Sequence, residues 1–235
     1  MNTEKNKSGS YVGISLSCLL VLSCANAASL LVNSGFEQAV PGLQPQNYIY
    51  TNQTNMSPWQ TTASDGLIEV WSTGFNPEGV QFNASTGAGV RDGGNQFVEI
   101  NATQASTLYQ SVDISSAGSL DFYFLHRGRG SASIEDILKV TITYLGGESP
   151  LVVYEGNFGA TNAQWELHEA FGVFEVTPET FGTYQFAYTA ISSANGNQSY
   201  GNFIDNVGFG VNIPEPSTAL LSVLGAGFLM RRRRI

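Results

Sequence analysis

Strict alternation of apolar and polar residues recurs throughout the middle of this chain. In Lys139-Val-Thr-Ile-Thr-Tyr144 the apolar side chains fall on one face of an extended segment, and Leu120-Asp-Phe-Tyr-Phe124 repeats the pattern. A period of two is typical of an antiparallel strand with one buried face, whereas no part of the body shows a convincing helical period. Strands are predicted on this basis at residues 30–33, 67–71, 96–100, 107–114, 119–126, 138–145, 151–154, 165–176, 183–191 and 203–209.

Clusters of glycine, asparagine and serine separate these runs, and such clusters are typical of turns. Many short strands at close spacing predict an all-β fold in which two antiparallel sheets pack as a jelly-roll β-sandwich. The strands fall within residues 28–212, a segment long enough to form one domain with its own core. We therefore expect a single β-sandwich domain over these residues.

The N-terminal segment has the pattern of a secretory signal peptide. Lys5 and Lys7 precede an apolar run over residues 12–24, which is followed by Ala25-Asn-Ala27-Ala28. Residues 1–27 are therefore predicted to be removed by a cut before Ala28. A lipoprotein anchored at Cys24 is an alternative, because Leu22-Ser-Cys24 half resembles a lipobox. Both cysteines lie in this segment, so the mature body would form no disulfide.

The C-terminal segment is apolar and ends in four arginines. Residues 219–230 contain no charge, but they are fewer than the about 20 that a spanning helix needs. Arg231, Arg232, Arg233 and Arg234 would resist crossing a bilayer and stay in the cytoplasm. A short hydrophobic helix that stops transfer is predicted here. A buried core helix is disfavoured, because four adjacent arginines at its end would repel one another.

Pro214, Glu215 and Pro216 precede this apolar segment. Together the three parts of residues 213–235 resemble the PEP-CTERM sorting signal of Gram-negative, exopolysaccharide-producing bacteria, also described as the ice-binding protein C-terminal domain. The resemblance implies export through the inner membrane and processing by an exosortase-type peptidase. It also implies release or attachment at the cell surface or in the extracellular matrix. Ice binding is suggested only by the second name of this signal. The chain itself lacks the regular threonine-rich repeats of an ice-binding face.

Residues 28–212 carry four basic and 17 acidic residues. Such a surface excludes nucleic acid and anionic membranes as partners, because the phosphate groups of both would be repelled. Divalent cations and neutral sugars are better suited to it. The charge balance therefore favours an extracellular binding role over a nucleic-acid-binding one.

Two segments at opposite ends of the body, Val32-Asn-Ser-Gly-Phe-Glu37 and Asn202-Phe-Ile-Asp-Asn-Val207, resemble the first and last strands of a galactose-binding-like β-sandwich. This sandwich occurs in many carbohydrate-binding modules, and segments 96–101, 108–112 and 118–125 resemble its middle in the same order. The resemblance implies that the two ends meet and that a structural calcium ion lies between them. Glu37 and Asp205 would supply carboxylates to the six to eight oxygen ligands that Ca²⁺ takes. In the alternative, these carboxylates accept hydrogen bonds from loop amides or arginine side chains.

A sugar site needs aromatic faces for the C–H surface of the ring and planar polar groups for its hydroxyls. Glu69 and Trp71 share a strand face by their spacing, and His126-Arg-Gly-Arg-Gly130 holds two of the body's four basic residues. The predicted ligand site therefore consists of Glu69, Trp71, His126, Arg127 and Arg129. Core packing of the tryptophan and pairing of the arginines with acids are the alternatives.

No motif for catalysis is evident. The chain has no Gly-x-Ser-x-Gly elbow, no His-Glu-x-x-His helix and no phosphate-binding loop. The sequence thus predicts a secreted, surface-sorted, non-catalytic protein that binds polysaccharide, such as the exopolysaccharide of its own cell. A structural or adhesive matrix protein without specific sugar binding is the alternative, and a secreted glycan-active enzyme is the third.

Overall fold

The computed structural model describes residues 29–75 and 94–213, and these residues form two β-sheets. Both short helical turns, η1 (Gln53–Met56) and η2 (Pro178–Thr180), are of the 3₁₀ type. Sheet A contains β1 (Tyr48–Asn52), β3 (Leu67–Ser72), β4 (Gln96–Glu99), β12 (Phe203–Asn212), β6 (Gly118–Arg127) and β10 (Glu175–Val176) in this order, with β9 (Glu166–Ala170) also paired to β6. Sheet B contains β2 (Gln60–Thr61), β5 (Thr107–Ile114), β11 (Gly182–Ser192), β7 (Asp136–Tyr144) and β8 (Leu151–Ala160).

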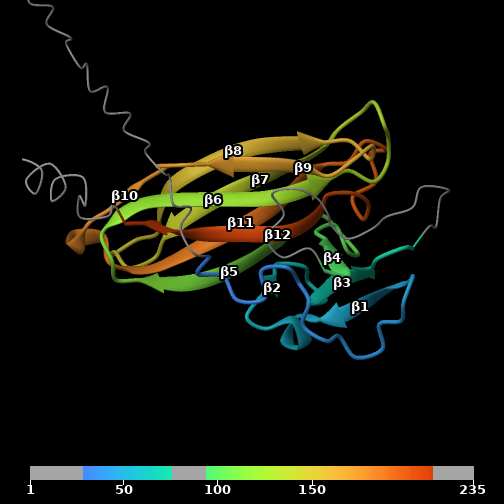
Figure 1. The fold of residues 1–235 in the computed structure, drawn as a ribbon, viewed down its shortest axis with the longest axis horizontal. Coiled ribbons are helices and arrows are strands. Elements are labelled where there is room, and N and C mark those ends of the chain that lie inside the picture. The colour runs from blue at the N-terminus through green and yellow to red at the C-terminus, as the bar shows by residue number, and fades with distance from the viewer. Residues whose placement is uncertain (1–28, 76–93, 214–235) are drawn as a thin grey trace, which may run out of the picture.

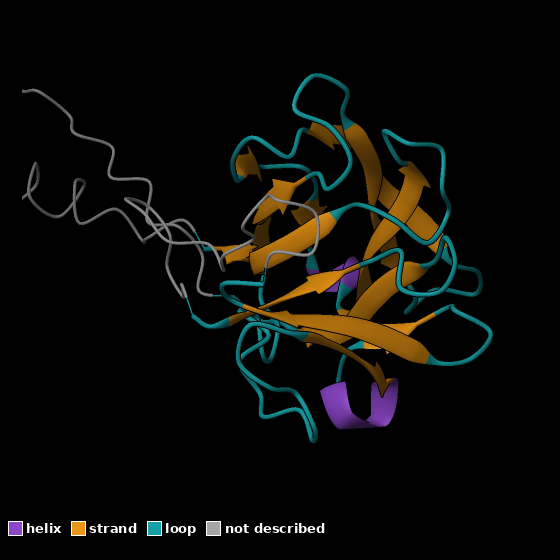
Figure 2. Cartoon of the chain, turned by 90° about the vertical axis from the view of Figure 1, so that its right-hand side faces the viewer, coloured by secondary structure: helices purple, strands orange, loops and turns teal. Residues whose placement is uncertain are grey.

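The strand pairs described in both sheets are antiparallel. In sheet A, β6 and β12 run side by side along the length of the molecule, with Phe122 opposite Phe209 (Figure 1). Strands make up nearly all of the regular structure when the molecule is turned by 90° (Figure 2). The antiparallel two-sheet β-sandwich predicted from the alternation of the sequence is therefore confirmed.

Aromatic side chains from the two sheets interlock to form the core. Phe122 of β6 lies 5.6 Å from Phe186 of β11, and Phe186 stacks on Phe209 at 4.9 Å between ring centroids. These three rings are almost completely buried. Burial of each contributes about 1.5–3 kcal/mol relative to exposure. Because the core has this aromatic packing, the two sheets form a rigid support for the side chains on their outer faces.

Several predicted strands differ in extent from those of the structure; the strand predicted at 151–154, for example, continues to Ala160. Residues 30–33 do not form a strand, although the Leu30 amide donates to the Phe209 carbonyl beside β12. Asn33 and Phe36 have φ angles of 54° and 57°, which end any extended conformation there. The predicted strand at 165–176 is divided into β9 and β10. Gly172, with φ of 62°, lies in the break between them.

The two-residue strand β2 was not predicted, and neither was β1. Its sequence is Tyr-Ile-Tyr-Thr-Asn, and it pairs with β3 at the edge of sheet A. Its outward residues are aromatic rather than polar, so the usual contrast between the two faces of a strand is missing. Together β1, β3 and β4 form one end of the sandwich (Figure 1). This end carries the side chains of the candidate site.

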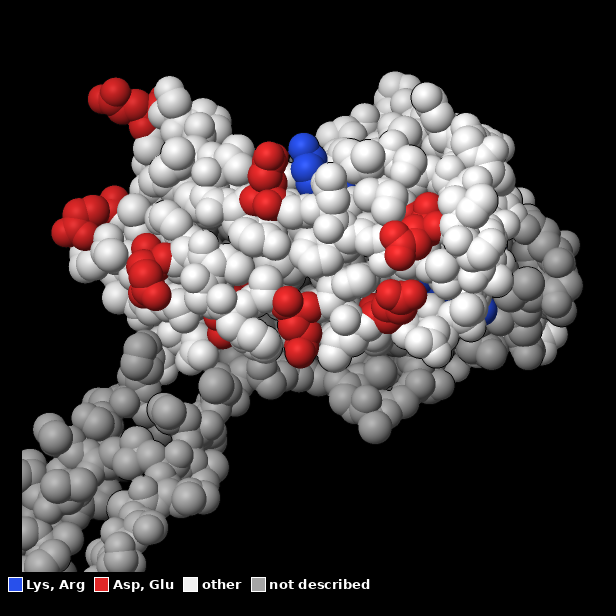
Figure 3. Space-filling view, turned by 90° about the horizontal axis from the view of Figure 1, so that it is seen from above, with Lys and Arg blue, Asp and Glu red and all other residues white. Residues whose placement is uncertain are grey.

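Several sequence predictions concern residues outside the described ranges. The signal peptide at 1–27 lies there, as do Pro214, Glu215, Pro216 and the arginines 231–234 of the sorting signal. Within the described ranges, no helix has the length and apolar character to cross a membrane. Acidic side chains are spread across one long side of the molecule, where basic ones are few (Figure 3).

Candidate functional site

Two carboxylates and two aromatic side chains stand side by side on the outer face of sheet A, where β3 meets β4. Because side chains alternate between the two faces of β3, Val70 points into the core between the sheets, whereas Glu69 and Trp71 point outward. The antiparallel register places Glu69 opposite Glu99 and Trp71 opposite Phe97. Glu69 and Trp71 therefore share a face, as their spacing predicts.

A second aromatic cluster, separate from the main core, forms the floor of this site. Trp71, Phe97 and Phe203 are wholly buried, and the partly buried Phe75 and Trp165 pack against them. Phe203 meets Trp71 and Phe97 edge-on at 4.9 and 5.2 Å between centroids. Each such edge-on pair contributes about 0.5–1.5 kcal/mol beyond the burial of its area. The floor of the site is consequently rigid.

The Arg129 guanidinium lies between two aromatic rings. Its central carbon is 4.9 Å from the centroid of Trp71 and 3.8 Å from that of Tyr200. Nη1 donates to both carboxylate oxygens of Glu99, at 3.0 and 3.2 Å. The Arg129 amide also donates to the buried Asp136 carboxylate at 2.7 Å, which fixes the backbone. With only 14% of its side chain exposed, Arg129 is a fixed part of the site, and its burial strengthens the cation–π contacts.

The two carboxyl groups differ in protonation. Burial, followed by the charge of Glu99, raises the pKa of Glu69 to about 9. Burial also raises the pKa of Glu99, but Arg129 and the Gly201 amide oppose the change. We therefore assign the proton to Glu69 and the negative charge to Glu99, where Arg129 balances it. The charges of Glu99 and Arg129 are then paired with each other, so the cluster suits an uncharged ligand better than an ion.

Tyr48 and Tyr50 form the accessible part of the site. They stand opposite Trp71 and Glu69, respectively, and are 38% and 42% exposed. Tyr48 stacks on Trp71 at 5.4 Å and 24°, and Tyr50 meets Tyr48 edge-on at 5.6 Å. Burial and then the charge of Glu69 raise the pKa of Tyr50 to about 12, so its hydroxyl stays a hydrogen-bond donor. We call the two exposed rings the tyrosine face.

The other two predicted site residues lie elsewhere. His126 points into the core, where it is wholly buried, and its Nε2 is 3.1 Å from Asn202 Oδ1. Burial and then His168 lower the pKa of His126 to about 3, so this side chain is neutral. Arg127 is on the outer face, but its Nε and Nη2 donate to the Asn162 carbonyl at 3.0 and 2.8 Å. The structure thus brings together Glu69, Trp71 and Arg129 but not His126.

Four residues of the site were not anticipated: Tyr48, Tyr50, Glu99 and Tyr200. The tyrosines carried a local signal, since Tyr-Ile-Tyr-Thr consists of strong strand formers. Glu99 and Tyr200 carried none. Glu99 reaches the site through the pairing of β3 with β4, and Tyr200 reaches it from the loop before β12.

The two predicted calcium ligands, Glu37 and Asp205, have different surroundings. Glu37 Oε1 accepts hydrogen bonds from the Asn95 and Gln96 amides at 2.8 Å each, which is the alternative role considered for it. Asp205 is wholly buried, and the adjacent Asn206 has a buried Oδ1 without a hydrogen-bond partner among the described residues. Carboxylate and amide oxygens are ligands that calcium prefers, so this end of β12 fits the ion.

The remaining ligands of such an ion would not be side-chain acids or imidazoles. Over residues 29–75 and 94–213, no group of three or more His, Cys, Asp and Glu side chains is placed to hold a metal. Calcium sites are often completed by backbone carbonyls, amide side chains and water. A calcium ion near Asp205 would therefore need a donor set of this mixed type.

No family model matches the chain, and no curated protein matches it in sequence. Solved structures with a similar β-sandwich include a family 61 carbohydrate-binding module in complex with β-1,4-galactotriose. The match has 16% identity and a TM-score of 0.46, and it covers 77% of this chain and 97% of the module. A family 22 xylan-binding domain from Paenibacillus barcinonensis matches at 11% identity and a TM-score of 0.40, covering 70% and 98%.

An enzyme is also among the similar structures. The enzymatically active domain of tailspike protein 4 from bacteriophage CBA120 matches at 12% identity and a TM-score of 0.42. This match covers 78% of the present chain but 21% of the tailspike chain. The class that the present structure itself defines is an antiparallel two-sheet β-sandwich.

Proposed function

We propose that this protein is exported and non-catalytic and that it binds a neutral polysaccharide through the tyrosine face. The observation that carries the proposal is the pair of exposed rings, Tyr48 and Tyr50, which rests on a buried base in which Arg129 is paired with Glu99. Sugar rings present apolar C–H surfaces that pack on aromatic faces, and their hydroxyls pair with polar groups beside them. Trp71 stacks on Tyr48 and holds it in place, and Tyr50 packs edge-on against Tyr48.

The positions of the carboxyl groups support a binding role over hydrolysis. Glycosidases place two carboxyl groups on either side of the scissile bond, about 5 Å apart or more. Here Glu69 and Glu99 are direct cross-strand neighbours and both are 1% exposed. Glu69 accepts from Trp71 Nε1 at 3.0 Å, and Glu99 pairs with Arg129. Their bonds serve the base of the site rather than a substrate.

A structural calcium ion held by Glu37 and Asp205 is part of the proposal. Asp205 supplies a buried carboxylate, and the orphaned Asn206 Oδ1 next to it supplies a second oxygen. The ion would tie the segment before β1 to the last strand. In a domain without cysteine, this link would add stability by binding only the folded state.

Sorting to the cell surface is the remaining part of the proposed function. We infer it from Pro214, Glu215 and Pro216, the apolar segment and the arginines at 231–234. An exosortase-type peptidase of the inner membrane would process the chain near this motif. The mature protein would then act at the cell surface or in the extracellular matrix of a Gram-negative bacterium, where polysaccharide is abundant.

The alternative is a matrix protein that binds no specific sugar, and one observation favours it. The Arg129 guanidinium contacts two aromatic rings, and its ion pair with Glu99 is internal, so this arginine serves the fold first. A glycan array separates the two functions. Binding of the full chain to neutral polysaccharides, with less to acidic ones, is expected; absence of binding to any glycan would favour the matrix role.

A further inference from the structure

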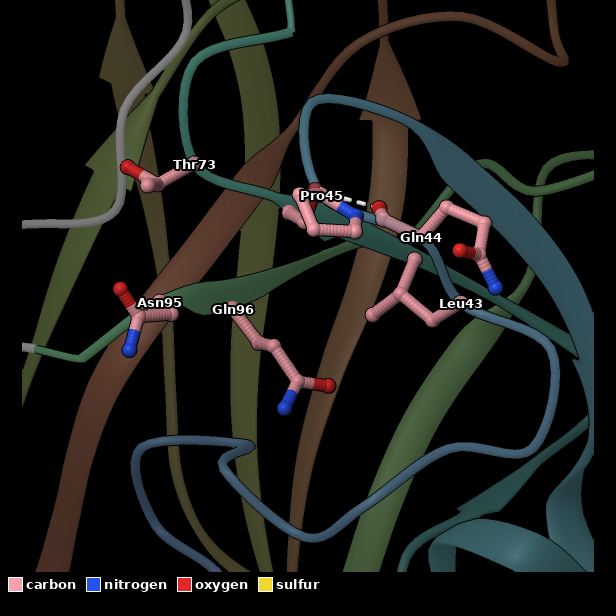
Figure 4. A pocket seen from close by; sticks show the side chains of 7 residues that line it. Leu43, Gln44, Pro45, Thr73, Asn95 and Gln96 are labelled. Atoms are coloured by element: carbon pink, nitrogen blue, oxygen red, sulfur yellow. Dashed lines mark hydrogen bonds between the residues drawn. The ribbon is translucent and has the colours of Figure 1, made fainter.

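A pocket separate from the tyrosine face lies at the same end of the sandwich, between the loop before β1 and the adjoining ends of β3 and β4. Its volume is about 270 Å³. In Figure 4 Asn95 and Gln96, at the start of β4, lie on one side of it, and Leu43, Gln44 and Pro45 lie on the other. Gln96 alternates with Phe97, which faces the aromatic floor, so the pocket opens on the opposite side of β4 from the tyrosine face.

Backbone hydrogen bonds hold the walls of this pocket in place. Ser72 Oγ donates to the Gln44 carbonyl at 2.9 Å and accepts from the Asn47 amide at 3.1 Å. The Ser72 amide donates in turn to the Asn47 carbonyl at 2.8 Å, and the Thr73 amide donates to the Asn95 carbonyl at 2.8 Å. The loop is thus fastened to the end of β3, and β3 is fastened to the residue before β4. Such a pocket is formed before any ligand arrives.

One polar atom of the pocket has no partner. Gln96 Oε1 is buried but accepts no hydrogen bond among the described residues. The backbone of Gln96 is fixed, since its amide donates to the Glu37 carboxylate at 2.8 Å. A buried acceptor without a donor is unfavourable for the free protein, and proteins leave few of them. The unpaired acceptor indicates a ligand that carries a hydrogen-bond donor.

The lining of the pocket defines the chemistry of that ligand. The amides of Gln44, Asn95 and Gln96 and the hydroxyl of Thr73 are neutral donors and acceptors, and among residues 29–75 and 94–213 no charged side chain lines the pocket. A charged ligand would lose its hydration without gaining a counter-ion. Leu43 and Pro45 add an apolar wall. The volume is slightly below the about 300–1,000 Å³ of typical small-molecule sites, which fits one ring rather than a chain of sugars.

We propose that this pocket binds a single neutral sugar ring, such as a terminal residue or side branch of a polysaccharide. A ring hydroxyl donates to Gln96 Oε1, and the C–H face of the ring contacts Leu43 and Pro45. The proposal extends the proposed function, because two sites on one protein would hold one polymer more strongly than either alone. The pocket itself is independent of the tyrosine face and can be tested without it.

The test is an NMR titration of the ¹⁵N-labelled full chain with glucose, galactose, mannose and N-acetylglucosamine, each used alone. At least one of these sugars should shift the amide signals of residues 43–45, 72–73 and 95–96 at millimolar concentration. Gln96→Leu should weaken that binding about tenfold or more. The same variant should melt at the wild-type temperature or higher, because it removes an unpaired acceptor. Gln185→Leu, which removes a half-buried amide from β11, is the matched control and should bind as the wild type does.

Three results would overturn the proposal: no shift at these amides with any of the four sugars, wild-type affinity in Gln96→Leu, or an equal loss in the control. Should Gln96→Leu fail to fold, Asn95→Ala replaces it, since Asn95 is exposed and its truncation is tolerated by the fold. The double variant Tyr48→Ala/Tyr50→Ala keeps the monosaccharide site. Loss of polysaccharide binding with retained monosaccharide binding therefore distinguishes failure of one site from failure of the other.

Discussion

Glu69 of β3 stands directly opposite Glu99 of β4, and both side chains are 1% exposed. Two like charges opposite each other in a sheet destabilise it. The pair is tolerated because Arg129 neutralises Glu99 and because Glu69 keeps its proton. The consequence is a rigid base beneath the tyrosine face, and the stability of that base depends on pH.

The protonation of Glu69 predicts a loss of stability at high pH. Burial and the charge of Glu99 raise its pKa from 4.5 to about 9, so over this range the folded chain binds a proton that the unfolded chain has released. The contribution is therefore complete below pH 4.5 and declines as the pH rises toward about 9, by at most about 1.4 kcal/mol per pH unit. Glu69→Gln should give a flatter profile, measured as the free energy of unfolding in urea between about pH 6 and 9.

The matched control is Glu155→Gln. Glu155 is exposed and forms a surface ion pair with Lys139 at 3.6 Å, so its loss should leave the pH profile unchanged. A Glu69→Gln profile that runs parallel to the wild-type profile would show that Glu69 is ionised in the folded protein.

Removal of Arg129 should be strongly destabilising, because it leaves Glu99 buried without its counter-ion. Loss of one partner of a buried pair costs about 3–5 kcal/mol. Adding Glu99→Gln to Arg129→Ala should restore part of this loss, since the uncompensated charge is then gone. A double-mutant cycle of unfolding free energies measures the coupling. Lys139→Ala, the control, should cost only about 0–1 kcal/mol; a similar value for Arg129→Ala would refute the internal role of the ion pair.

The proposed calcium ion predicts a response to chelation. EDTA should lower the melting temperature of the full chain, and added calcium should restore it, because the ion binds only the folded state. The response should be absent from the double variant Glu37→Ala/Asp205→Asn. A double variant that still responds as the wild type does would place the ion elsewhere, and an unaltered melting temperature in EDTA would remove calcium from the account.

Processing at both ends is also predicted. The protein recovered from its native cells should begin near Ala28 and lack residues 219–235, and intact-mass spectrometry measures both ends at once. A mass that still includes the four terminal arginines would contradict the proposed sorting. A lipid-modified Cys24 would support the lipoprotein alternative.

The sequence predicted the fold well because alternation is a local property. The buried face of a strand can be read from its own sequence, without knowing which strands pair with it. In β7, for example, the apolar residues Val140, Ile142 and Tyr144 alternate with polar ones and are buried. The same rule bears on His126, which was predicted as a site residue at the end of the strand over 119–126. In β6 it has the parity of Phe124 and faces the core, where it is wholly buried. Alternation along the predicted strand itself would have placed it there.

The site was only partly predictable because its parts come together through pairing. Glu69 and Trp71 are two residues apart in one strand, so their spacing alone predicts that they share a face. Glu99 joins them through the β3–β4 register, and Tyr200 joins them across Arg129 from a loop before the last strand. No pattern within a single strand specifies such neighbours. The tyrosines were missed for a different reason, since β1 has aromatic side chains where an exposed strand face normally has polar ones.

The affinity of the double variant Tyr48→Ala/Tyr50→Ala for a polysaccharide that the wild type binds is the most direct test of the central claim. The account predicts at least about a tenfold loss, equal to about 1.4 kcal/mol, with little change in the melting temperature, since both rings are more than one-third exposed. Tyr109→Ala removes a tyrosine from β5 in the other sheet and should bind as the wild type does. Wild-type affinity in the double variant, or an equal loss in Tyr109→Ala, would contradict binding at the tyrosine face.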